Sequence, residues 1–146
     1  MDSLVQTTSA WVITIPGVMR GKQRARVAIR GRFASAYTPK ETVNAEAWVK
    51  RCAVDQIGSP CLDIPLDIAI QITVQIAESW SNKKRAAALA GEIKPTGKPD
   101  LDNCAKLLCD ALNGVIWKDD SQIVAMTLIK RYGERPQTVL KIWEAA

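Results

Sequence analysis

The clearest periodic pattern in the chain runs from Leu101 to Val115. Polar residues Asp102, Lys106 and Asp110 recur there at intervals of four, on the side opposite an apolar stripe. The apolar stripe consists of Leu101, Cys104, Ala105, Leu108, Ala111, Leu112 and Val115. Pro99-Asp100 suits a helix start and Asn113-Gly114 suits a helix end. The pattern therefore predicts a short amphipathic helix with one buried face and one charged face.

A second pattern, strict alternation, predicts strands. From Leu66 to Ile76 aliphatic residues alternate with polar or small ones, so one strand face is wholly aliphatic. That face must be buried against a helix or another subunit, and we consider it a possible dimer interface. A short strand is also predicted from Trp11 to Ile15, closed by Pro16-Gly17.

The remaining segments complete an α+β arrangement. A packing helix is predicted from Pro39 to about Ile57 with Thr38 as a possible cap, and a short alanine-rich helix from Ser81 to near Gly91. Two strands, Ile123–Lys130 and Gln137–Trp143, are predicted to form a closing hairpin. We expect one small domain over residues 1–146, with a mixed or antiparallel sheet, about two main helices and a flexible leader at 1–10.

Charge is unevenly distributed along this chain. Its 20 Lys and Arg against 15 Asp and Glu give a net charge of +5, yet the acids concentrate around the predicted amphipathic helix. Every charged residue from Arg20 to Arg32 is basic, which predicts a twisted hairpin or a mobile loop that contacts phosphates. A basic body around an acidic pocket favours a nucleic-acid substrate with a divalent cation between the two. The alternatives are a solvated surface hairpin and a net charge without a partner.

The composition also excludes several kinds of chemistry. The chain has no histidine, which rules out imidazole zinc sites and Ser-His or Cys-His nucleophile pairs. Oxygen ligands alone favour Mg²⁺ or Mn²⁺. The four cysteines form no Cys-x-x-Cys pair, and no signal peptide or membrane-length apolar run is visible, so we expect a cytoplasmic protein without a membrane partner.

The acids at the two ends of the predicted helix are the candidate metal ligands. If the segment from Trp117 to Asp120 returns beside the first helical turn, three or four carboxylates can meet, with Asp100, Asp102 and Asp120 holding the ion. Lys106 would then steady negative charge on a phosphate or position the attacking water. Each residue also has a simpler explanation, as a cap, a first-turn acid, a solvated cation or a turn residue. Asp119 is a possible outer ligand, and Asp110 a partner of Lys106.

These residues resemble a known family. The segments that carry the resemblance are Lys98-Pro99-Asp100-Leu101-Asp102-Asn103, Lys106, Asp110-Ala111-Leu112-Asn113-Gly114 and Trp117-Lys118-Asp119-Asp120-Ser121-Gln122. They closely resemble the RusA-type Holliday junction resolvases in order and spacing. Weaker similarity extends to Ile15–Gly17, Gly21–Arg26, Tyr37–Lys40 and Ser79–Arg85, so most of the chain is covered.

The resemblance implies a small homodimeric α+β endonuclease that binds four-way DNA junctions and cuts two opposing strands with Mg²⁺ or Mn²⁺. The family's catalytic positions fall on Asp100, Asp102, Lys106 and Asp120. The expected DNA-binding residues are Lys22, Arg24, Arg26, Lys83, Lys84, Arg85 and Lys98. Immediately before the acids the family often has arginines or His-Thr, where this chain has Lys94–Pro99. The alternatives are a branched or flap DNA nuclease without strict four-way preference, and a catalytically silent DNA-binding module.

Overall fold

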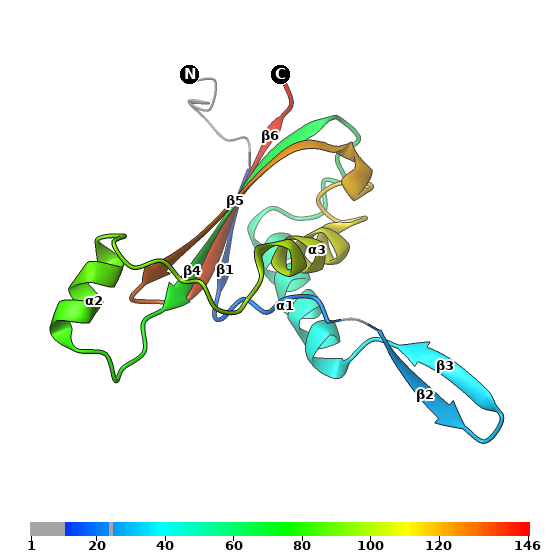
Figure 1. Ribbon diagram of the computed structural model, residues 1–146. Helices are drawn as coiled ribbons and strands as arrows, with labels where there is room; N and C mark the ends of the chain where they lie inside the picture. The colour runs from blue at the N-terminus through cyan, green and yellow to red at the C-terminus, as the bar shows by residue number, and fades with distance from the viewer. Residues whose placement is uncertain (1–10, 24) are drawn as a thin grey trace.

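The protein has an α+β fold, as the computed structural model in Figure 1 shows. The structure describes residues 11–23 and 25–146, so the leader expected at 1–10 lies outside the described residues. Four strands form a mixed sheet in the order β1-β6-β4-β5. Their bounds are β1 Trp11–Pro16, β4 Leu66–Gln75, β5 Ile123–Gly133 and β6 Gln137–Glu144. The predicted fold class is confirmed.

The pairing of the last two strands differs from the prediction. β5 and β6 follow one another in the chain, but β4 lies between them, parallel to β5 and antiparallel to β6. The predicted closing hairpin is therefore wrong. Alternating residues identify a strand but not its partner, and here the partner of both strands, β4, lies far earlier in the chain.

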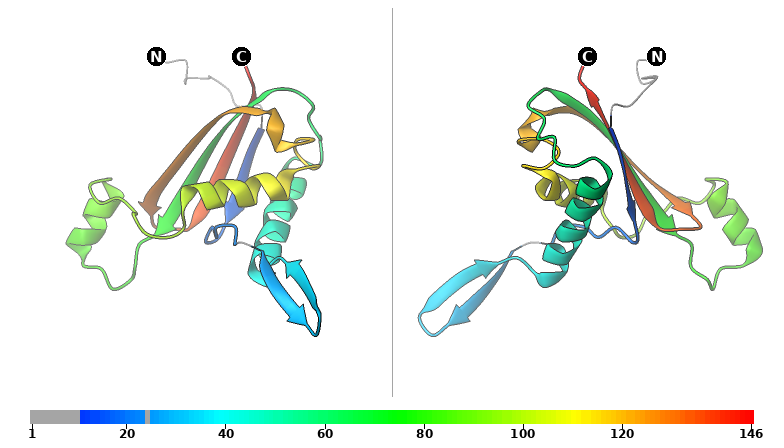
Figure 2. Two further views of the ribbon diagram at one scale, coloured as in Figure 1. Left: turned by 45° about the vertical axis from the view of Figure 1, so that its right-hand side comes forward. Right: turned by 180° about the vertical axis from the view of Figure 1, so that it is seen from behind.

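The core lies between one sheet face and two helices, α1 (Lys40–Gln56) and α3 (Leu101–Leu112). Figure 2 shows both helices on the same side of the sheet. Leu66, Ile68, Ile70 and Ile72 of β4 are buried in this core. The aliphatic face of β4 thus packs against the protein's own helices, and the hypothesis that it forms a dimer interface is wrong.

The helix starts follow the predicted positions, with one exception. The short helix α2 (Asn82–Leu89) begins at Ser81, whose hydroxyl accepts a hydrogen bond from the Lys84 amide at 3.2 Å. At α1, however, the N-cap residue is Pro39 and no side chain caps the helix, so the cap predicted at Thr38 is not formed. Among the described residues, no helix combines the length and apolar character needed to cross a bilayer.

The basic arm after β1 is a hairpin. Strands β2 (Arg26–Arg30) and β3 (Phe33–Tyr37) pair antiparallel in a separate two-stranded sheet. Figures 1 and 2 show this hairpin projecting from the body beyond one end of α1. Of the two structures that the sequence left open, hairpin and loop, the hairpin is the one observed.

Candidate active site on helix α3

Helix α3 has one buried apolar face and one charged face, as the periodicity predicts. Its core side is buried through Cys104, Ala105, Leu107, Leu108, Cys109, Ala111 and Leu112. Asp102 and Lys106 are exposed and lie four residues apart, which places them one above the other on the same face. An acid and a lysine are thus presented together to solvent at the start of the helix.

Asp100 occupies the N-cap position of α3, but its carboxylate does not cap the helix. Instead it accepts hydrogen bonds from Lys98 Nζ at 3.0 Å and from Asn103 Nδ2 at 3.3 Å, with its side chain 43% exposed. A purely capping explanation for Asp100 therefore does not apply. The carboxylate faces outward between a cation and an amide.

Lys130 of β5 supports the loop before Asp100. Its ammonium donates hydrogen bonds to the backbone carbonyls of Gly97 at 2.7 Å and Pro99 at 3.0 Å. These two bonds tie the loop that carries Asp100 to the sheet. Sequence reasoning missed Lys130, because a lysine in a strand carries no local signal of a contact more than thirty residues away.

Cys104 is buried near the acids and Lys130. Burial raises the pKa of the Cys104 thiol to about 11, while Lys130 opposes that rise and Asp100 and Asp102 add to it. All three charged groups therefore act on the same buried sulfur. Asp100, Asp102 and Lys130 form the charged environment at the N-terminal end of α3.

Asp120 is not part of α3 but lies in the segment that follows it. It shares an open pocket of about 310 Å³ with Cys109 and the first residues of β5. Burial raises the pKa of Cys109 to about 11, and the charge of Asp120 is the next largest contribution. The segment that carries Asp120 thus returns beside the C-terminal half of α3, rather than beside its first turn as predicted.

Asp119 fixes the position of this segment. Its carboxylate accepts a hydrogen bond from the Ser121 amide at 3.0 Å, and Gln122 completes a capping box around the short 3-10 helix Asp120–Gln122. Hydrogen bonding by Ser121 lowers the pKa of Asp119. Asp119 is therefore a structural cap, whereas the neighbouring Asp120 is left to face α3.

The expected meeting of three carboxylates is not observed. Within residues 11–23 and 25–146, no group of three or more Asp, Glu, Cys or His is arranged to hold a metal ion. Asp100 and Asp102 start the helix, while the capping box at Asp119 holds Asp120 near its other end. All three acids thus lie at α3, but Asp100 and Asp102 are at its N-terminal end and Asp120 is beside its C-terminal half.

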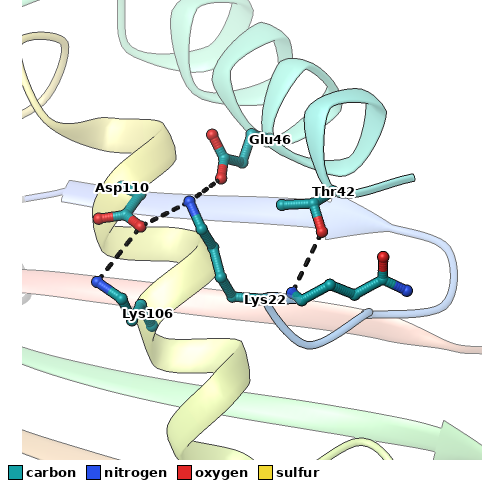
Figure 3. Close-up of polar contacts among 6 residues, drawn as sticks. Lys22, Thr42, Glu46, Lys106 and Asp110 are labelled. Atoms are coloured by element: carbon teal, nitrogen blue, oxygen red, sulfur yellow. Dashed lines mark hydrogen bonds and ion pairs between the residues drawn. The ribbon is translucent and has the colours of Figure 1, made fainter. Parts of the chain in front are cut away.

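An ion network crosses the middle of α3, as Figure 3 shows. Lys22 Nζ lies 2.6 Å from Glu46 of α1 and 2.8 Å from Asp110 of α3, and Asp110 also lies 3.6 Å from Lys106 Nζ. Burial opposes the charge of Lys22, but its hydrogen bonds to Asp110 and Glu46 prevail and raise its pKa. Lys22, which the sequence suggests as a DNA contact, is thus held between two carboxylates.

The base of the hairpin arm contacts α3 directly. The Lys22 amide donates to the Asn103 carbonyl at 2.9 Å, and a Cβ added at Gly21 would lie 2.8 Å from Asn103 Cβ. Only glycine permits that approach. A pocket of about 400 Å³ lies between the arm's base and Asp100, and Arg20, Lys98 and Asp100 are among the residues that line it.

The other predicted DNA contacts are distributed around this region. Lys83 and Lys84 are exposed on α2, where Lys84 Nζ lies 3.9 Å from the centre of the Trp80 ring, while Arg85 donates to the Ala77 carbonyl at 3.3 Å. Lys98 is 84% exposed beside Asp100. Arg26 is exposed on β2, whereas Arg24 lies outside the described residues.

Comparison with known proteins identifies the family. The family model described as Endodeoxyribonuclease RusA matches residues 16–143. The chain is also similar to the uncharacterized protein YqaN of Bacillus subtilis (strain 168), at 31% identity over 135 residues that cover 91% of this chain and 95% of the relative. Both matches include every described element from α1 to β5. The chain belongs to the RusA family of endodeoxyribonucleases.

Proposed function

We propose that this protein is a metal-dependent endodeoxyribonuclease that binds four-way DNA junctions and resolves them by paired incision of opposing strands. The RusA family match supports the nuclease activity and the branched DNA substrate. The net charge of +5, with exposed lysines on α2 and arginines on the hairpin, suits a polyanionic substrate. We propose that residues 1–146 act as a single unit in a reducing cytoplasm.

The arrangement on α3 carries this proposal. Asp102 and Lys106 are exposed on one face of the helix, and the Asp100 carboxylate beside them makes no capping bond. An acid pair followed one turn later by a lysine suits phosphodiester hydrolysis, which needs an activated water and a cation near the phosphate.

The donor set suits a hard divalent cation. Mg²⁺ is commonly bound by one or two carboxylates together with waters and substrate phosphate, so a cage of three protein ligands is not required. Asp100 and Asp102 would hold the ion, with Asp120 as a third candidate ligand. A Mg²⁺ or Mn²⁺ ion held there would supply an activated water and would neutralise charge on the scissile phosphate.

The protein's own groups have separable roles. Lys106 would stabilise negative charge that develops on the phosphate, and its ammonium lies 3.6 Å from the Asp110 carboxylate. Lys98, beside Asp100, offers a cation to the phosphate at the edge of the site. Lys130 donates to two backbone carbonyls of the loop that carries Asp100, so we assign it as a positioning residue.

Paired incision requires two equivalent sites related by a two-fold axis, so we propose a homodimer. Light scattering coupled to size exclusion measures the mass directly. A mass of about twice 16.0 kDa is expected. A monomer, free and on junction DNA, would contradict coordinated cutting and leave a nuclease that cuts strands singly.

The cleavage experiment uses a labelled synthetic four-way junction, a flap and a linear duplex, each with Mg²⁺, with Mn²⁺ and with chelator. We expect paired symmetric cuts in the junction, dependent on metal and lost in Asp102→Asn. Equal cutting of the flap and the junction would favour a general branch nuclease. Tight junction binding without cutting under any metal would favour a silent DNA-binding module.

The pair Asp119 and Asp120 offers a matched control for the third acid. Asn is a good capping residue, so Asp119→Asn should keep the 3-10 helix and retain most of the activity. Asp120→Asn should lower cleavage by at least about a hundredfold if its carboxylate binds the ion. Equal activity of the two variants would remove Asp120 from the proposed ligands.

A further inference from the structure

The β2–β3 hairpin has two chemically different faces. Residues directly opposite in an antiparallel pair share a face, and the register pairs Arg26 with Tyr37, Ala28 with Ser35 and Arg30 with Phe33. The intervening pairs are Val27 with Ala36 and Ile29 with Ala34. One face thus carries the basic and aromatic positions, and the other is aliphatic.

The aromatic residues of this hairpin are strongly exposed. Phe33 is 80% exposed beside the turn at Gly31-Arg32, and Tyr37 is 46% exposed near the base. All five residues of β3 are exposed. An isolated two-stranded hairpin is at best marginally stable in water, so a partner that covers these rings would also stabilise the arm.

Charge indicates which partner fits. The segment from Arg20 to Arg32 contains basic residues and no Asp or Glu, and Arg26 and Arg32 are exposed. Such a segment repels a second copy of itself and attracts phosphates. Exposed aromatic rings among cations are also the arrangement that binds unpaired bases, because every base offers a face for stacking.

The base of the hairpin connects this surface to the candidate active site. The Lys22 amide donates to the Asn103 carbonyl, and the Gln23 amide donates to Thr42 Oγ1 at 3.2 Å. Figure 3 labels Thr42 and marks the bond to its hydroxyl by a dashed line. The arm is therefore attached to α1 and to the first turn of α3. DNA bound along the arm would therefore extend toward Asp100 and Asp102 at the start of α3.

We propose that the β2–β3 hairpin is a branch-sensing arm, in which Arg26 contacts a phosphate and Phe33 stacks on a base exposed at the branch point. This inference rests on the proposed function, because it assumes a branched DNA substrate. It adds a recognition element at the tip of the arm, separate from the acids that perform the chemistry.

The test measures binding without cutting, in chelator, to a four-way junction that carries 2-aminopurine at the branch point and to a fully paired duplex. Phe33→Ala should weaken junction binding about tenfold, as expected for the loss of one base–aromatic stack, and leave duplex binding within about twofold. It should also abolish the change in 2-aminopurine emission on binding. Phe33→Trp should restore both signals.

Two further variants test the phosphate contact and the aliphatic face of the hairpin separately. Arg26→Gln should weaken binding to junction and duplex by equal factors, because a phosphate contact does not distinguish them. Ile29→Ala, on the aliphatic face and 76% exposed in the native arm, should leave both affinities unchanged. A loss in Ile29→Ala equal to that in Phe33→Ala, with a fall in molecular mass, would instead show that a second copy covers the arm.

The outcomes also distinguish this inference from the proposed function. If the wild type cuts junctions and Phe33→Ala binds and cuts them equally well, the branch-sensing arm is refuted and the nuclease remains. If the wild type neither binds nor cuts branched DNA, both proposals fail together.

Discussion

At the scale of single residues, Lys130 shows how a side chain far from the motif supports it. Its two hydrogen bonds hold the loop before Asp100, at 2.7 and 3.0 Å. A misplacement of about 1 Å in a catalytic group can cost about a hundredfold in rate. The position of the Asp100 carboxylate therefore depends on a residue of the neighbouring sheet.

Lys130→Met should lower the cleavage rate about tenfold to a hundredfold, because the loop that carries Asp100 loses both anchors. The activity should also require a higher Mg²⁺ concentration, which a purely structural defect would not cause. Cleavage measured against Mg²⁺ concentration, with the melting temperature measured in parallel, tests this. The exposed Lys141→Met on β6 is the control, and an unchanged metal requirement in Lys130→Met would contradict the positioning role.

The four cysteines should differ in reactivity in the folded protein. Cys61 is exposed, whereas Cys52, Cys104 and Cys109 are buried, and burial raises the pKa of both Cys104 and Cys109 to about 11. At pH 8 only roughly one in a thousand of those two thiols is ionised. Titration with a disulfide reagent should show one fast thiol, absent in Cys61→Ser, and the others only after unfolding. A second fast thiol would contradict the described burial.

At the scale of elements, the loop between β1 and β2 contacts both α1 and α3. It contributes Gly21, which lies against Asn103, and Lys22, which bridges Glu46 and Asp110. The same loop therefore fixes the positions of the hairpin and of the two helices relative to one another. It also contacts Asp110, the ion-pair partner of Lys106. A substitution in this loop should mainly lower the stability of the fold. Its effect on catalysis should be smaller and indirect, because Asp110 contacts Lys106.

Gly21→Ala tests the close approach. The added Cβ would lie 2.8 Å from Asn103 Cβ, so loop and helix must separate, at a cost of about 1 to 3 kcal/mol in unfolding free energy. Gly97→Ala is the matched control, since its Cβ would meet nothing within 4 Å, and it should change stability by less than about 0.5 kcal/mol. Urea denaturation measures both variants, and equal stability of the two would disprove the tight contact.

Lys22→Met tests the ion network. Its removal should cost about 1 to 2 kcal/mol at pH 7, because two half-buried carboxylates lose their shared partner. The pKa of Lys22 is raised above 10.5, so the contribution is complete below that pH and is lost as pH rises through the raised value. The stability gap between wild type and variant should thus narrow only above about pH 10.5. A gap that narrows near neutral pH would contradict this assignment.

At the scale of the whole molecule, positive charge lies on two projections on either side of α3. Figures 1 and 2 show the hairpin and α2 extending in different directions from the sheet and helix layers. Helix α3, which carries the acids, follows both projections in the chain but lies between them in the fold. This distribution suits a substrate with several DNA arms, which can reach both projections while one strand passes the acids.

Salt dependence distinguishes cations that meet phosphate from those that are internally paired. Each phosphate contact contributes about 0.9 to the slope of log affinity against log salt concentration. Lys83→Ala, at an exposed position of α2, should reduce the slope by about one. Lys22→Ala should leave the slope nearly unchanged, because its charge is paired with Glu46 and Asp110. Equal slope changes would mean that DNA displaces the internal partners of Lys22.

The sequence by itself determined the local features of this protein. Periodicity predicted α3 with its buried and charged faces, alternation predicted β4, and Ser81 marked the start of α2. The motif from Lys98 to Gln122 indicated the family before any geometry was known. Such features depend on residues within a few positions of one another, so the chain order contains them directly.

Only the tertiary structure decided which distant segments meet. It placed β4 between β5 and β6, Lys22 between two carboxylates, Lys130 under the Asp100 loop, and Asp120 beside Cys109. Each contact joins residues far apart in the chain, and its formation depends on strand order and helix packing. Local patterns specify which face of an element is buried, but the burial partner is chosen by the packing of the whole chain.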